Sequence, residues 1–514
     1  MNGAVSLLQT LINGGVEVCF TNPGTSEMHF VAALDRVEGM RTVLGLFEGV
    51  CTGAADGYAR MTGKPAATLL HLGPGLGNGL ANLHNARRAR SPVVNIVGDH
   101  ATYHLQHDPP LATDIQSMAK TVSGWVRTCS DASSVPKDAA AAIAASLKPP
   151  GRVATLILPA DCSWNESAAP FPAPEIPKPV SVDPGTIERI ARILRRGERT
   201  VILMADPFLM EKPLWLGGRI ARATHARLIA NRVNSRAQRG AGRVNIARLP
   251  YPVQPALKML QGTKHLVLVG AKPPVSFFAW PGMPNWLTPD GCQVHTLATP
   301  EEDGVTALEM LADAVHAPAE PDGVNAMKRP PLPTGEITAE KVWISLAALM
   351  PENAVISDEA VSSSRNADEW MTGAPPHDWL SIMGGAIGQG LPVATGAAIA
   401  CPDRKIFSMQ ADGSAMYTLQ SLWTQAHENL DIITVLFANH SYKILAGELR
   451  RVGVEWACPK AEKLFDLDNP RIDWVHLATG MGVHAERAAT AEEFNGHLKE
   501  AIQTHGPHLI EIGL

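Results

Sequence analysis

The chain has 514 residues, of which 45% are hydrophobic, and its net charge is −6. This length exceeds what one hydrophobic core supports, so we expect two to four domains, and the negative charge offers no basic surface for nucleic acid. No stretch reaches the ~18 uninterrupted apolar residues that span a bilayer.

The N-terminal residues 1–16 predict an amphipathic helix rather than a signal peptide, because no basic segment precedes the apolar residues. The seven cysteines are scattered and include no CxxC pair, which is typical of a reducing compartment. We therefore expect a cytoplasmic protein without a membrane or nucleic-acid partner.

Two proline-rich stretches, at residues 169–184 and 317–335, divide the chain into three blocks. Proline fixes the backbone and lacks an amide donor, so such stretches connect domains rather than fill them. We expect domains at residues 1–168, 180–316 and 336–514.

Each block alternates apolar β-rich runs with helical patterns, which predicts an α/β fold of three domains, each a parallel sheet flanked by helices. The clearest predicted strands are residues 17–20, 41–46, 66–71, 92–97, 200–204, 227–230, 265–269, 354–357, 405–409 and 432–437.

Several polar residues of the first block are candidates for chemistry. Glu48 follows the strand at 41–46 and opens a helix of small residues, where the helix dipole alone favours a glutamate. His71 ends the strand at 66–71 and is either a buried core histidine or a functional group. Thr25 lies in a turn after the first strand. A later loop adds three weaker candidates for proton transfer, His100, His104 and His107.

In the third block, a glycine-rich run at residues 384–392 precedes a helix and is either a plain loop or a ligand-binding segment. The strand at 405–409 continues to Asp412, and Asn439 ends the next strand. Asp412 and Asn439 can therefore meet at the carboxyl edge of a parallel sheet, where open α/β sheets bind ligands. Between them a helical pattern places four side chains on one face, those of Met416, Leu419, Trp423 and Ala426.

The residue types at this edge suit a metal and a diphosphate. Carboxylate and amide oxygens suit Mg²⁺, which takes few protein ligands and completes its shell with phosphate oxygens. Free backbone amides at the start of the following helix can hold a phosphate group, namely those of Gly413, Ser414 and Ala415. The alternative is a strand-to-helix turn that Asp412 merely caps.

The segment that starts at Ala411-Asp412-Gly413-Ser414 and ends at Ala438-Asn439 resembles the thiamine diphosphate motif of the decarboxylase and acetolactate synthase superfamily. The resemblance covers essentially the whole chain and implies pyrimidine-binding, middle and diphosphate-binding domains in that order. It implies that Mg²⁺ binds Asp412, Asn439 and the backbone carbonyl of Ser441. Ala411 and Ala438 depart from the motif's first glycine and first asparagine, and neither departure removes a presumed ligand side chain.

Other segments carry the same resemblance. Glu48 precedes a helix that ends in DGYAR, and the resemblance implies that it hydrogen-bonds N1′ of the cofactor and activates it. It also implies that Ile387 supports the bent cofactor and that the Gly385 carbonyl lies near N4′. Ser362 would make a further phosphate contact. Flavin, which some acetolactate synthases bind, has no support in the sequence.

Two residues resemble benzoylformate decarboxylase. Thr25 stands where that enzyme has a serine that contacts the substrate carboxylate, and His71 stands at the position of its first catalytic histidine. Other residues do not match benzoylformate decarboxylase. The second histidine of that enzyme has no counterpart here, and the loop at 73–75 is closer to that of acetolactate synthase. Phe47 replaces a histidine found in many relatives. The chain therefore resembles an acetolactate synthase-like homologue that matches neither pattern fully.

Three residues fall where relatives shape the substrate pocket: Ile444, Leu445 and Glu448. An apolar wall there would favour a 2-oxo acid with a hydrophobic side chain. Glu448 would disfavour a second carboxylate on the substrate.

The resemblance implies a thiamine diphosphate- and Mg²⁺-dependent decarboxylase or carboligase of 2-oxo acids, that is, a lyase or transferase. It also implies a homodimer or homotetramer with active sites between subunits. The alternative is a catalytically weak homologue that acts as a partner or regulatory subunit, with cofactor binding weakened by Ala411 and Ala438. The presence of Glu48 and Asp412 favours the enzyme.

Overall fold

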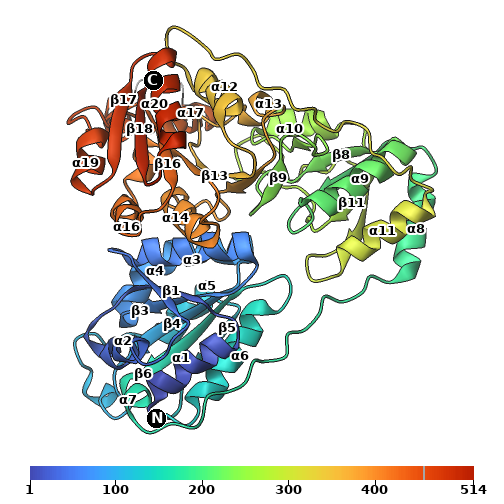
Figure 1. Ribbon diagram of the computed structural model, residues 1–514. Helices are drawn as coiled ribbons and strands as arrows, with labels where there is room; N and C mark the ends of the chain where they lie inside the picture. Colours follow the sequence, from blue (N-terminus) through green and yellow to red (C-terminus); the bar gives the residue numbers. More distant parts are fainter. Residues whose placement is uncertain (455–457) are drawn as a thin grey trace.

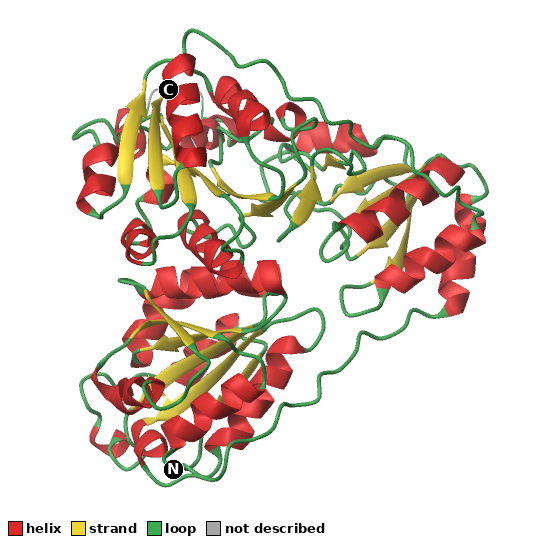
Figure 2. Ribbon diagram, in the orientation of Figure 1, coloured by secondary structure: helices red, strands yellow, loops and turns green. Residues whose placement is uncertain are grey.

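Three sheets flanked by helices make up the computed structural model of the chain, which describes residues 1–454 and 458–514 (Figure 2). The predicted α/β architecture of three parallel sheets is confirmed. Within the described ranges, no helix is both long and apolar enough to cross a membrane.

The first sheet has six parallel strands in the order β2-β1-β3-β4-β6-β5. Its strands are β1 (Val18–Asn22), β2 (Arg41–Leu44), β3 (Ala66–Leu70), β4 (Val93–Asp99), β5 (Trp125–Thr128) and β6 (Val153–Pro159). Its helices are α1 (Gly3–Asn13), α2 (Met28–Leu34), α3 (Glu48–Thr62), α4 (Leu72–Ala89), α5 (Ile115–Val122), α6 (Val135–Leu147) and α7 (Ala160–Trp164). Every residue of β3, β4 and β6 is buried, as expected when helices cover both faces of a parallel sheet.

The middle sheet has five parallel strands in the order β10-β8-β7-β11-β12. Its strands are β7 (Thr200–Met204), β8 (Arg227–Ala230), β10 (Ala247–Arg248), β11 (His265–Val269) and β12 (Gln293–Ala298). Its helices are α8 (Pro184–Leu194), α9 (Glu211–Thr224), α10 (Val253–Leu260) and α11 (Gly304–Ala314). Figure 1 shows an extended segment that leads from the N-terminal domain to α8.

The third sheet has seven strands in the order β17-β18-β16-β15-β13-β14-β9. Its strands are β9 (Ala237–Arg239), β13 (Ala354–Glu359), β14 (His377–Ser381), β15 (Ile406–Ala411), β16 (Ile432–Ala438), β17 (His484–Ala488) and β18 (His508–Gly513). Its helices are α12 (Ala339–Leu349), α13 (Ala367–Trp370), α14 (Gly390–Ala400), α15 (Asp412–Ala415), α16 (Ser421–His427), α17 (Lys443–Arg451), α18 (Pro459–Phe465), α19 (Trp474–Gly480) and α20 (Ala491–Gln503). Only β9 is antiparallel, and it comes from the middle block, so the middle domain adds a strand to the C-terminal sheet.

The helix predicted after Asp412 is interrupted. Helix α15 ends at Ala415 and α16 begins at Ser421. Between them, the amides of Tyr417 and Thr418 bond to carbonyls three residues back, and the Thr418 hydroxyl donates to the Gly388 carbonyl at 3.0 Å. This turn is therefore joined to the glycine-rich segment.

Helix α3 of the N-terminal domain packs directly against α14 of the C-terminal domain (Figure 1). A Cβ atom added to Gly396 would lie 1.9 Å from the Ala54 carbonyl oxygen, and one added to Gly57 would lie 2.2 Å from the Val393 carbonyl oxygen. The backbones of the two helices therefore touch, and only glycine fits at positions 57 and 396.

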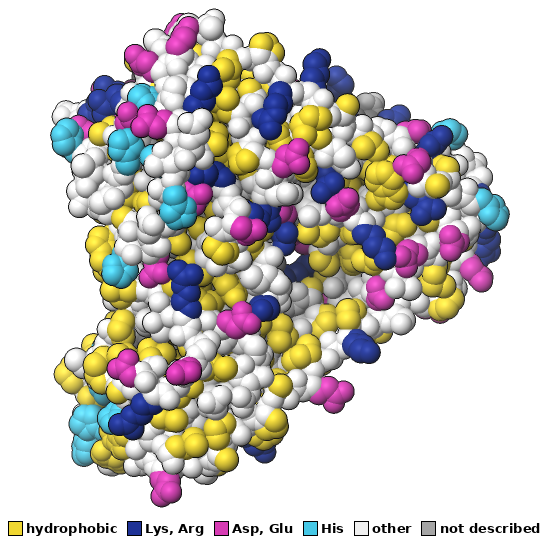
Figure 3. All heavy atoms as spheres, viewed as in Figure 1, with side chains coloured by type: hydrophobic (Ala, Val, Ile, Leu, Met, Phe, Trp, Pro, Cys, Tyr) yellow, Lys and Arg dark blue, Asp and Glu magenta, His cyan; other side chains and the backbone are white. Residues whose placement is uncertain are grey.

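A buried ion pair in α3 joins all three domains. Arg60 donates two hydrogen bonds to Asp56, from Nε to Oδ1 at 2.8 Å and from Nη2 to Oδ2 at 2.5 Å. Asp56 also accepts from Gln389 Nε2 at 2.9 Å, just before α14. Arg60 donates further to the carbonyls of Ser381 in the C-terminal domain (2.8 Å) and Ser235 in the middle domain (3.3 Å). Figure 3 shows the surface hollowed where the domains meet, with Lys and Arg side chains around the hollow.

Gly396→Ala is expected to destabilise the protein, because the added methyl group would overlap the Ala54 carbonyl oxygen. Overpacking of this kind lowers the free energy of unfolding by about 1–3 kcal/mol. The control is Gly496→Ala in α20, where nothing lies within 4 Å of the added Cβ and alanine should stabilise the helix by about 0.5–1 kcal/mol. Thermal unfolding followed by circular dichroism measures both variants, and equal melting temperatures would contradict the close helix contact.

Candidate active site

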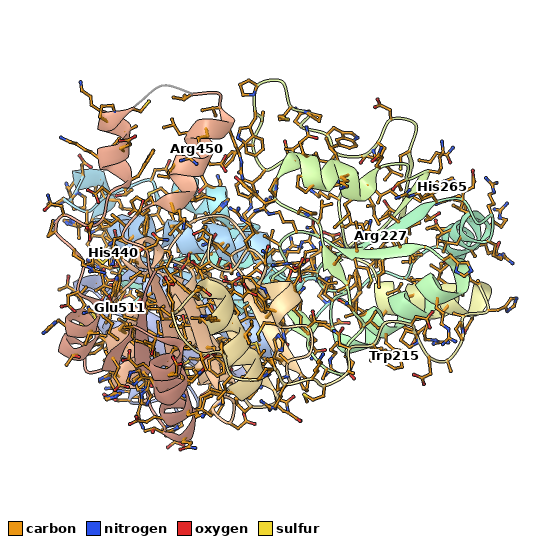
Figure 4. The ribbon with its side chains drawn as sticks, turned by 90° about the horizontal axis from the view of Figure 1, so that it is seen from above. Trp215, Arg227, His265, His440, Arg450 and Glu511 are labelled. Carbon is orange, nitrogen blue, oxygen red and sulfur yellow. The ribbon has the colours of Figure 1, made fainter. Side chains whose placement is uncertain are left out.

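The predicted metal residues lie at the ends of two neighbouring strands. Because β15 and β16 pair in parallel along their lengths, Asp412 and Asn439 leave the sheet at the same edge. The Asp412 carboxylate is buried and accepts the backbone amides of Gly413 (2.8 Å) and His440 (2.6 Å). Asn439 Oδ1 accepts the amide of Ser441 at 3.0 Å. The structure thus brings Asp412 to the turn that contains Asn439, which the labelled His440 marks in Figure 4.

The donor set at this edge fits a hard divalent cation. A carboxylate oxygen, an amide oxygen and a backbone carbonyl are ligands that Mg²⁺ accepts, with phosphate or water oxygens completing its shell. Burial raises the pKa of Asp412, and a bound cation would favour the ionised form. In the part of the chain that the structure describes, no three or more His, Cys, Asp or Glu side chains form a metal cluster, so a cation here would take few side-chain ligands.

The two alanines that depart from the motif have ordinary backbone conformations. Ala411 is extended, with φ −102° and ψ 153°, so its position does not require glycine. Ala438 is the last residue of β16, and its carbonyl accepts the amide of Leu514 at 3.0 Å. Gly413 differs, because an added Cβ would lie 2.4 Å from the Tyr442 ring. The turn therefore tolerates both alanines and requires glycine at position 413.

A buried glutamate outside the predicted set of site residues orders the glycine-rich segment. Glu359 ends β13 and accepts the backbone amides of Gly388 (2.8 Å), Gln389 (3.0 Å) and Gly390 (2.7 Å). Its own carbonyl accepts the Ser414 hydroxyl at 3.2 Å. Burial raises the pKa of Glu359 to about 7, against the three amides, which favour the ionised form. Glu359 therefore couples the glycine-rich segment to the turn after Asp412.

The glycine-rich segment also binds the N-terminal domain. Asn85 Oδ1 accepts the amides of Gly384 (3.1 Å) and Ala386 (3.2 Å), and Asn85 Nδ2 donates to the Ala386 carbonyl at 2.8 Å. Between them, Gly385 is exposed and has φ +75°, a conformation that favours glycine. Ile387 is half-buried. These contacts fix Gly385 and Ile387 at the boundary between the two domains.

Glu48 is the first residue of α3 and is 7% exposed. Asn78 donates to Glu48 Oε2 at 2.9 Å. Asn82 donates to the carbonyls of both Gly49 (2.7 Å) and Gly388 (3.1 Å), so the start of α3 lies next to the glycine-rich segment. The predicted carboxylate is therefore buried and held at the same domain boundary.

His71 forms a polar group with the turn at residues 24–27. Its Nδ1 lies 2.8 Å from Glu27 Oε2 and 3.2 Å from Ser26 Oγ. Glu27 is buried and accepts the Ser26 hydroxyl (2.6 Å) and the Gly24 amide (2.9 Å). A Cβ on Gly24 would lie 2.1 Å from the His71 ring, so glycine is required for this approach. Because Nδ1 faces a carboxylate, Nε2 is the ring atom left for a ligand.

Ser26, which is not among the predicted site residues, lies beside His71. Thr25 is exposed at the start of a short 3₁₀ helix, Thr25–Glu27. The contact of Glu27 with His71 was missed in the sequence because the two residues are 44 positions apart. A usable signal was the glutamate three residues after Gly24, the spacing of a capping box.

The three histidines of the later loop lie side by side. Ring centroids are 5.8 Å apart between His100 and His104, and 5.9 Å apart between His104 and His107. His104 and His107 are exposed. Within residues 1–454 and 458–514, no hydrogen bond links these histidines to the His71 group, and the buried His100 Nε2 has no partner.

Helix α17 carries the three predicted pocket residues, Ile444, Leu445 and Glu448. Ile444 is half-buried and Leu445 is exposed. Glu448 accepts hydrogen bonds from the Tyr251 hydroxyl (3.3 Å) and Trp280 Nε1 (3.2 Å), and it forms an ion pair with Arg451. The charge of Glu448 is therefore offset within the protein, and α17 contacts the middle domain through it.

Three turns near the site contain non-glycine residues with positive φ: Leu72 (48°), Val361 (49°) and His440 (50°). Such conformations are rare outside glycine and concentrate at functional sites. Each adjoins a predicted site residue, since Leu72 follows His71, Val361 precedes the half-buried Ser362, and His440 follows Asn439.

Comparison with known proteins agrees with this geometry. Residues 1–119 match the family described as thiamine pyrophosphate enzyme, N-terminal TPP binding domain. Residues 362–512 match thiamine pyrophosphate enzyme, C-terminal TPP binding domain. A Mycobacterium tuberculosis protein provisionally named acetolactate synthase large subunit IlvX is 52% identical over an alignment of 516 residues, which covers 100% of this chain and 99% of the relative.

Two further comparisons concern decarboxylases. Benzoylformate decarboxylase from Pseudomonas aeruginosa is 29% identical, with 97% of this chain and 96% of the relative covered. The solved thiamine diphosphate-dependent 4-hydroxybenzoylformate decarboxylase from Rhodococcus jostii shares the fold with a TM-score of 0.85 at 24% identity, over 99% of this chain and 98% of that chain.

Glu359→Gln is expected to change how stability depends on pH. The pKa of Glu359 is raised from 4.5 to about 7 in the folded protein, so the folded state holds this proton more tightly than the unfolded state. Its contribution to stability is full below about pH 4.5 and is lost as the pH rises to about 7, by up to ~1.4 kcal/mol per pH unit. Glutamine has no ionisable proton, so the variant lacks this contribution to the pH dependence of stability.

The stability of the wild type relative to Glu359→Gln should therefore fall between pH 5 and pH 7, measured by urea unfolding at intermediate pH values. Glu352→Gln, at an exposed position just before β13, is the control and should keep the pH dependence of the wild type. A difference that stays constant with pH would contradict the raised pKa.

Proposed function

We propose that the chain, which belongs to the thiamine pyrophosphate enzyme family, is a thiamine diphosphate- and Mg²⁺-dependent enzyme that decarboxylates 2-oxo acids. Protonation or carbon–carbon ligation would follow the decarboxylation. The observation that carries this proposal is the approach of Asp412 to the Asn439 turn at the edge of the C-terminal sheet. Relatives named acetolactate synthase and benzoylformate decarboxylase support the reaction class.

The cofactor's diphosphate would bind through the metal and through backbone amides. We assign Mg²⁺ to Asp412, Asn439 and the backbone carbonyl of Ser441. We assign the phosphate oxygens to Gly413, Ser414, Ala415 and, at the neighbouring turn, Ser362. These assignments rest on the oxygen donors at the strand ends and on the position of Gly413, Ser414 and Ala415 in the first turn of α15.

Bound thiamine diphosphate supplies a carbanion that adds to carbonyls and an electron sink for the bond that breaks. In this proposal Glu48 would hydrogen-bond N1′ and hold or release a proton there, and its burial favours a strong interaction with a ring nitrogen. Ile387 would support the cofactor, and the Gly385 carbonyl would accept a hydrogen bond from it. Glu359 acts as a positioning residue, because it holds three amides of the segment that presents them.

The substrate would lie between the turn at 24–27 and α17. We assign the carboxylate of the 2-oxo acid to Thr25 and proton transfer to His71 through Nε2, with Glu27 orienting the ring. Ile444 and Leu445 would form an apolar wall for a hydrophobic side chain. Glu448 would belong to the same wall, with its charge offset by Arg451.

We propose a homodimer or homotetramer in which a second copy completes each site. Leu46, just before Glu48, is 46% exposed, and Met416 and Tyr417, just after the diphosphate turn, are 39% and 54% exposed. Apolar side chains in these places suit burial against another subunit. The partner-subunit alternative gains no support, because Ala411 and Ala438 leave the turn geometry intact.

Titration of the metal-free protein with thiamine diphosphate, with and without Mg²⁺, tests the proposal, followed by CO₂ release from pyruvate and benzoylformate. We expect Mg²⁺-dependent binding and turnover by the wild type. Asp412→Ala should lose the Mg²⁺-dependent binding. Glu48→Gln should keep that binding and lower kcat by about 10²–10⁴-fold, the range of acid–base catalysis. If Asp412→Ala bound the cofactor as tightly as the wild type, the metal assignment would be wrong.

A mixture of Glu48→Gln and Asp412→Ala subunits tests whether the sites lie between subunits. If Glu48 and Asp412 of one site come from different subunits, each mixed dimer contains one site with both residues intact. Random exchange should then restore about a quarter of the wild-type activity. Mixing without subunit exchange is the control, and no recovery after exchange would place both residues of a site in one chain.

A further inference from the structure

An aromatic cluster from the middle domain lies beside the glycine-rich segment. It consists of Tyr251, Phe277, Phe278 and Trp280, and we call it the aromatic cluster. Ring centroids are 5.7 Å apart between Tyr251 and Phe277 and 4.8 Å between Phe277 and Phe278. Phe277 Cζ lies 3.3 Å from the position that a Cβ on Gly385 would take. The aromatic cluster therefore borders the position proposed for the reactive end of the cofactor.

Arg232 packs against this aromatic cluster. Its guanidinium carbon lies 3.7 Å from the Tyr251 ring centroid and 5.2 Å from the Phe277 ring centroid, both within cation–π range. Burial lowers the pKa of Arg232 to about 10. Among the residues that the structure describes, Arg232 makes no hydrogen bond and no ion pair. A partly buried cation without an acidic partner is unfavourable unless something else pairs with it.

The other charges around Arg232 are already paired. Arg451 lies 5.3 Å from the Tyr251 ring centroid and forms an ion pair with Glu448. Arg248 forms an ion pair with Asp368. Glu448 also accepts hydrogen bonds from Tyr251 and Trp280. Of these three arginines, Arg232 is the one for which the described residues provide no ion pair.

Phe277 connects this cation to the proposed active site, because its ring centroid lies 5.2 Å from the Arg232 guanidinium carbon and its Cζ lies 3.3 Å from the position of a Cβ on Gly385. Glu448 extends the connection to α17, whose last turn is marked by the labelled Arg450 in Figure 4. A ligand that reaches Arg232 from Gly385 would pass along an aromatic wall. Such a ligand would carry its reacting polar group at the end near Gly385 and an anionic group at the end near Arg232. The part between them would be apolar.

We propose that Arg232 binds a second carboxylate, at the far end of a 2-oxo acid substrate with an aromatic or apolar body. This inference rests on the proposed function and deepens it. A guanidinium presents paired N–H donors that match a carboxylate, and the stack on Tyr251 holds their plane fixed. The reacting carboxylate lies elsewhere in the proposal, at Thr25.

This assignment reverses the expectation drawn from Glu448 in the sequence. A free Glu448 would repel a second carboxylate, but Arg451 offsets its charge, and Arg232 adds a positive charge beside it. The described side chains around the aromatic cluster therefore favour an anionic substrate end.

A matched pair of substrates tests the proposal, namely 4-carboxyphenylglyoxylate and its neutral isostere 4-carbamoylphenylglyoxylate. The wild-type holoenzyme should prefer the carboxylate by at least about tenfold in kcat/KM. Arg232→Met should remove this preference, and Arg232→Lys should keep part of it. Arg450 is an exposed cation on α17, so Arg450→Met controls for the loss of one positive charge from the protein. This variant should retain the preference for the carboxylate.

Calorimetric binding of terephthalate and its neutral diamide terephthalamide, two non-reacting analogues, gives a readout that does not depend on turnover. Terephthalate should bind at least about tenfold more tightly to the wild type than to Arg232→Met, with the difference absent for terephthalamide. If terephthalate bound both proteins equally, the inference would fail whatever the turnover. Arg232-dependent terephthalate binding without turnover of any 2-oxo acid would support the site and overturn the proposed function instead.

Discussion

The contact between α3 and α14 is the constraint on which the rest of the site depends. Glu48 opens α3, and the glycine-rich segment runs directly into α14, so the register of these helices sets where the carboxylate lies relative to Gly385 and Ile387. Gly57 and Gly396 let the helix backbones touch. Larger residues would separate the helices and shift both Glu48 and the glycine-rich segment from their places at the domain boundary, because close-packed interiors transmit such shifts.

Polar contacts then fix the angle at which the domains meet. The Asp56–Arg60 pair is buried, so its net contribution to stability is small, but its geometry is specific. Asp56 reaches Gln389 before α14, and Arg60 reaches backbone carbonyls of the other two domains. Asn85 and Glu359 hold the intervening segment from opposite domains. The glycine-rich segment is thus positioned by two domains rather than by its own sequence.

The sequence predicted those residues of the candidate site that lie at the ends of neighbouring strands. Asp412 and Asn439 each follow an apolar strand, and parallel pairing brings them together without any long-range information. The contacts of Glu27 with His71, Glu359 with the glycine-rich segment, and Arg232 with Tyr251 were not predicted. Each joins segments whose spacing in the chain carries no periodic signal. The helix predicted after Asp412 is interrupted between Ala415 and Ser421, where Thr418 bonds to the distant Gly388, a contact that periodicity does not reveal.

The free-energy cost of the buried carboxylates and of the residues with positive φ near the site favours an enzyme over a partner subunit that has lost catalysis. Glu27, Glu48, Glu359 and Asp412 are buried carboxylates, and burying a carboxylate costs free energy unless hydrogen bonds or a cation offset it. Three non-glycine residues with positive φ adjoin the same site, each at a cost of about 1–3 kcal/mol. A chain relieved of catalysis would gain stability by losing these features, because most substitutions that relax such strain are stabilising. Their joint presence agrees with the proposed binding of a charged cofactor and its metal.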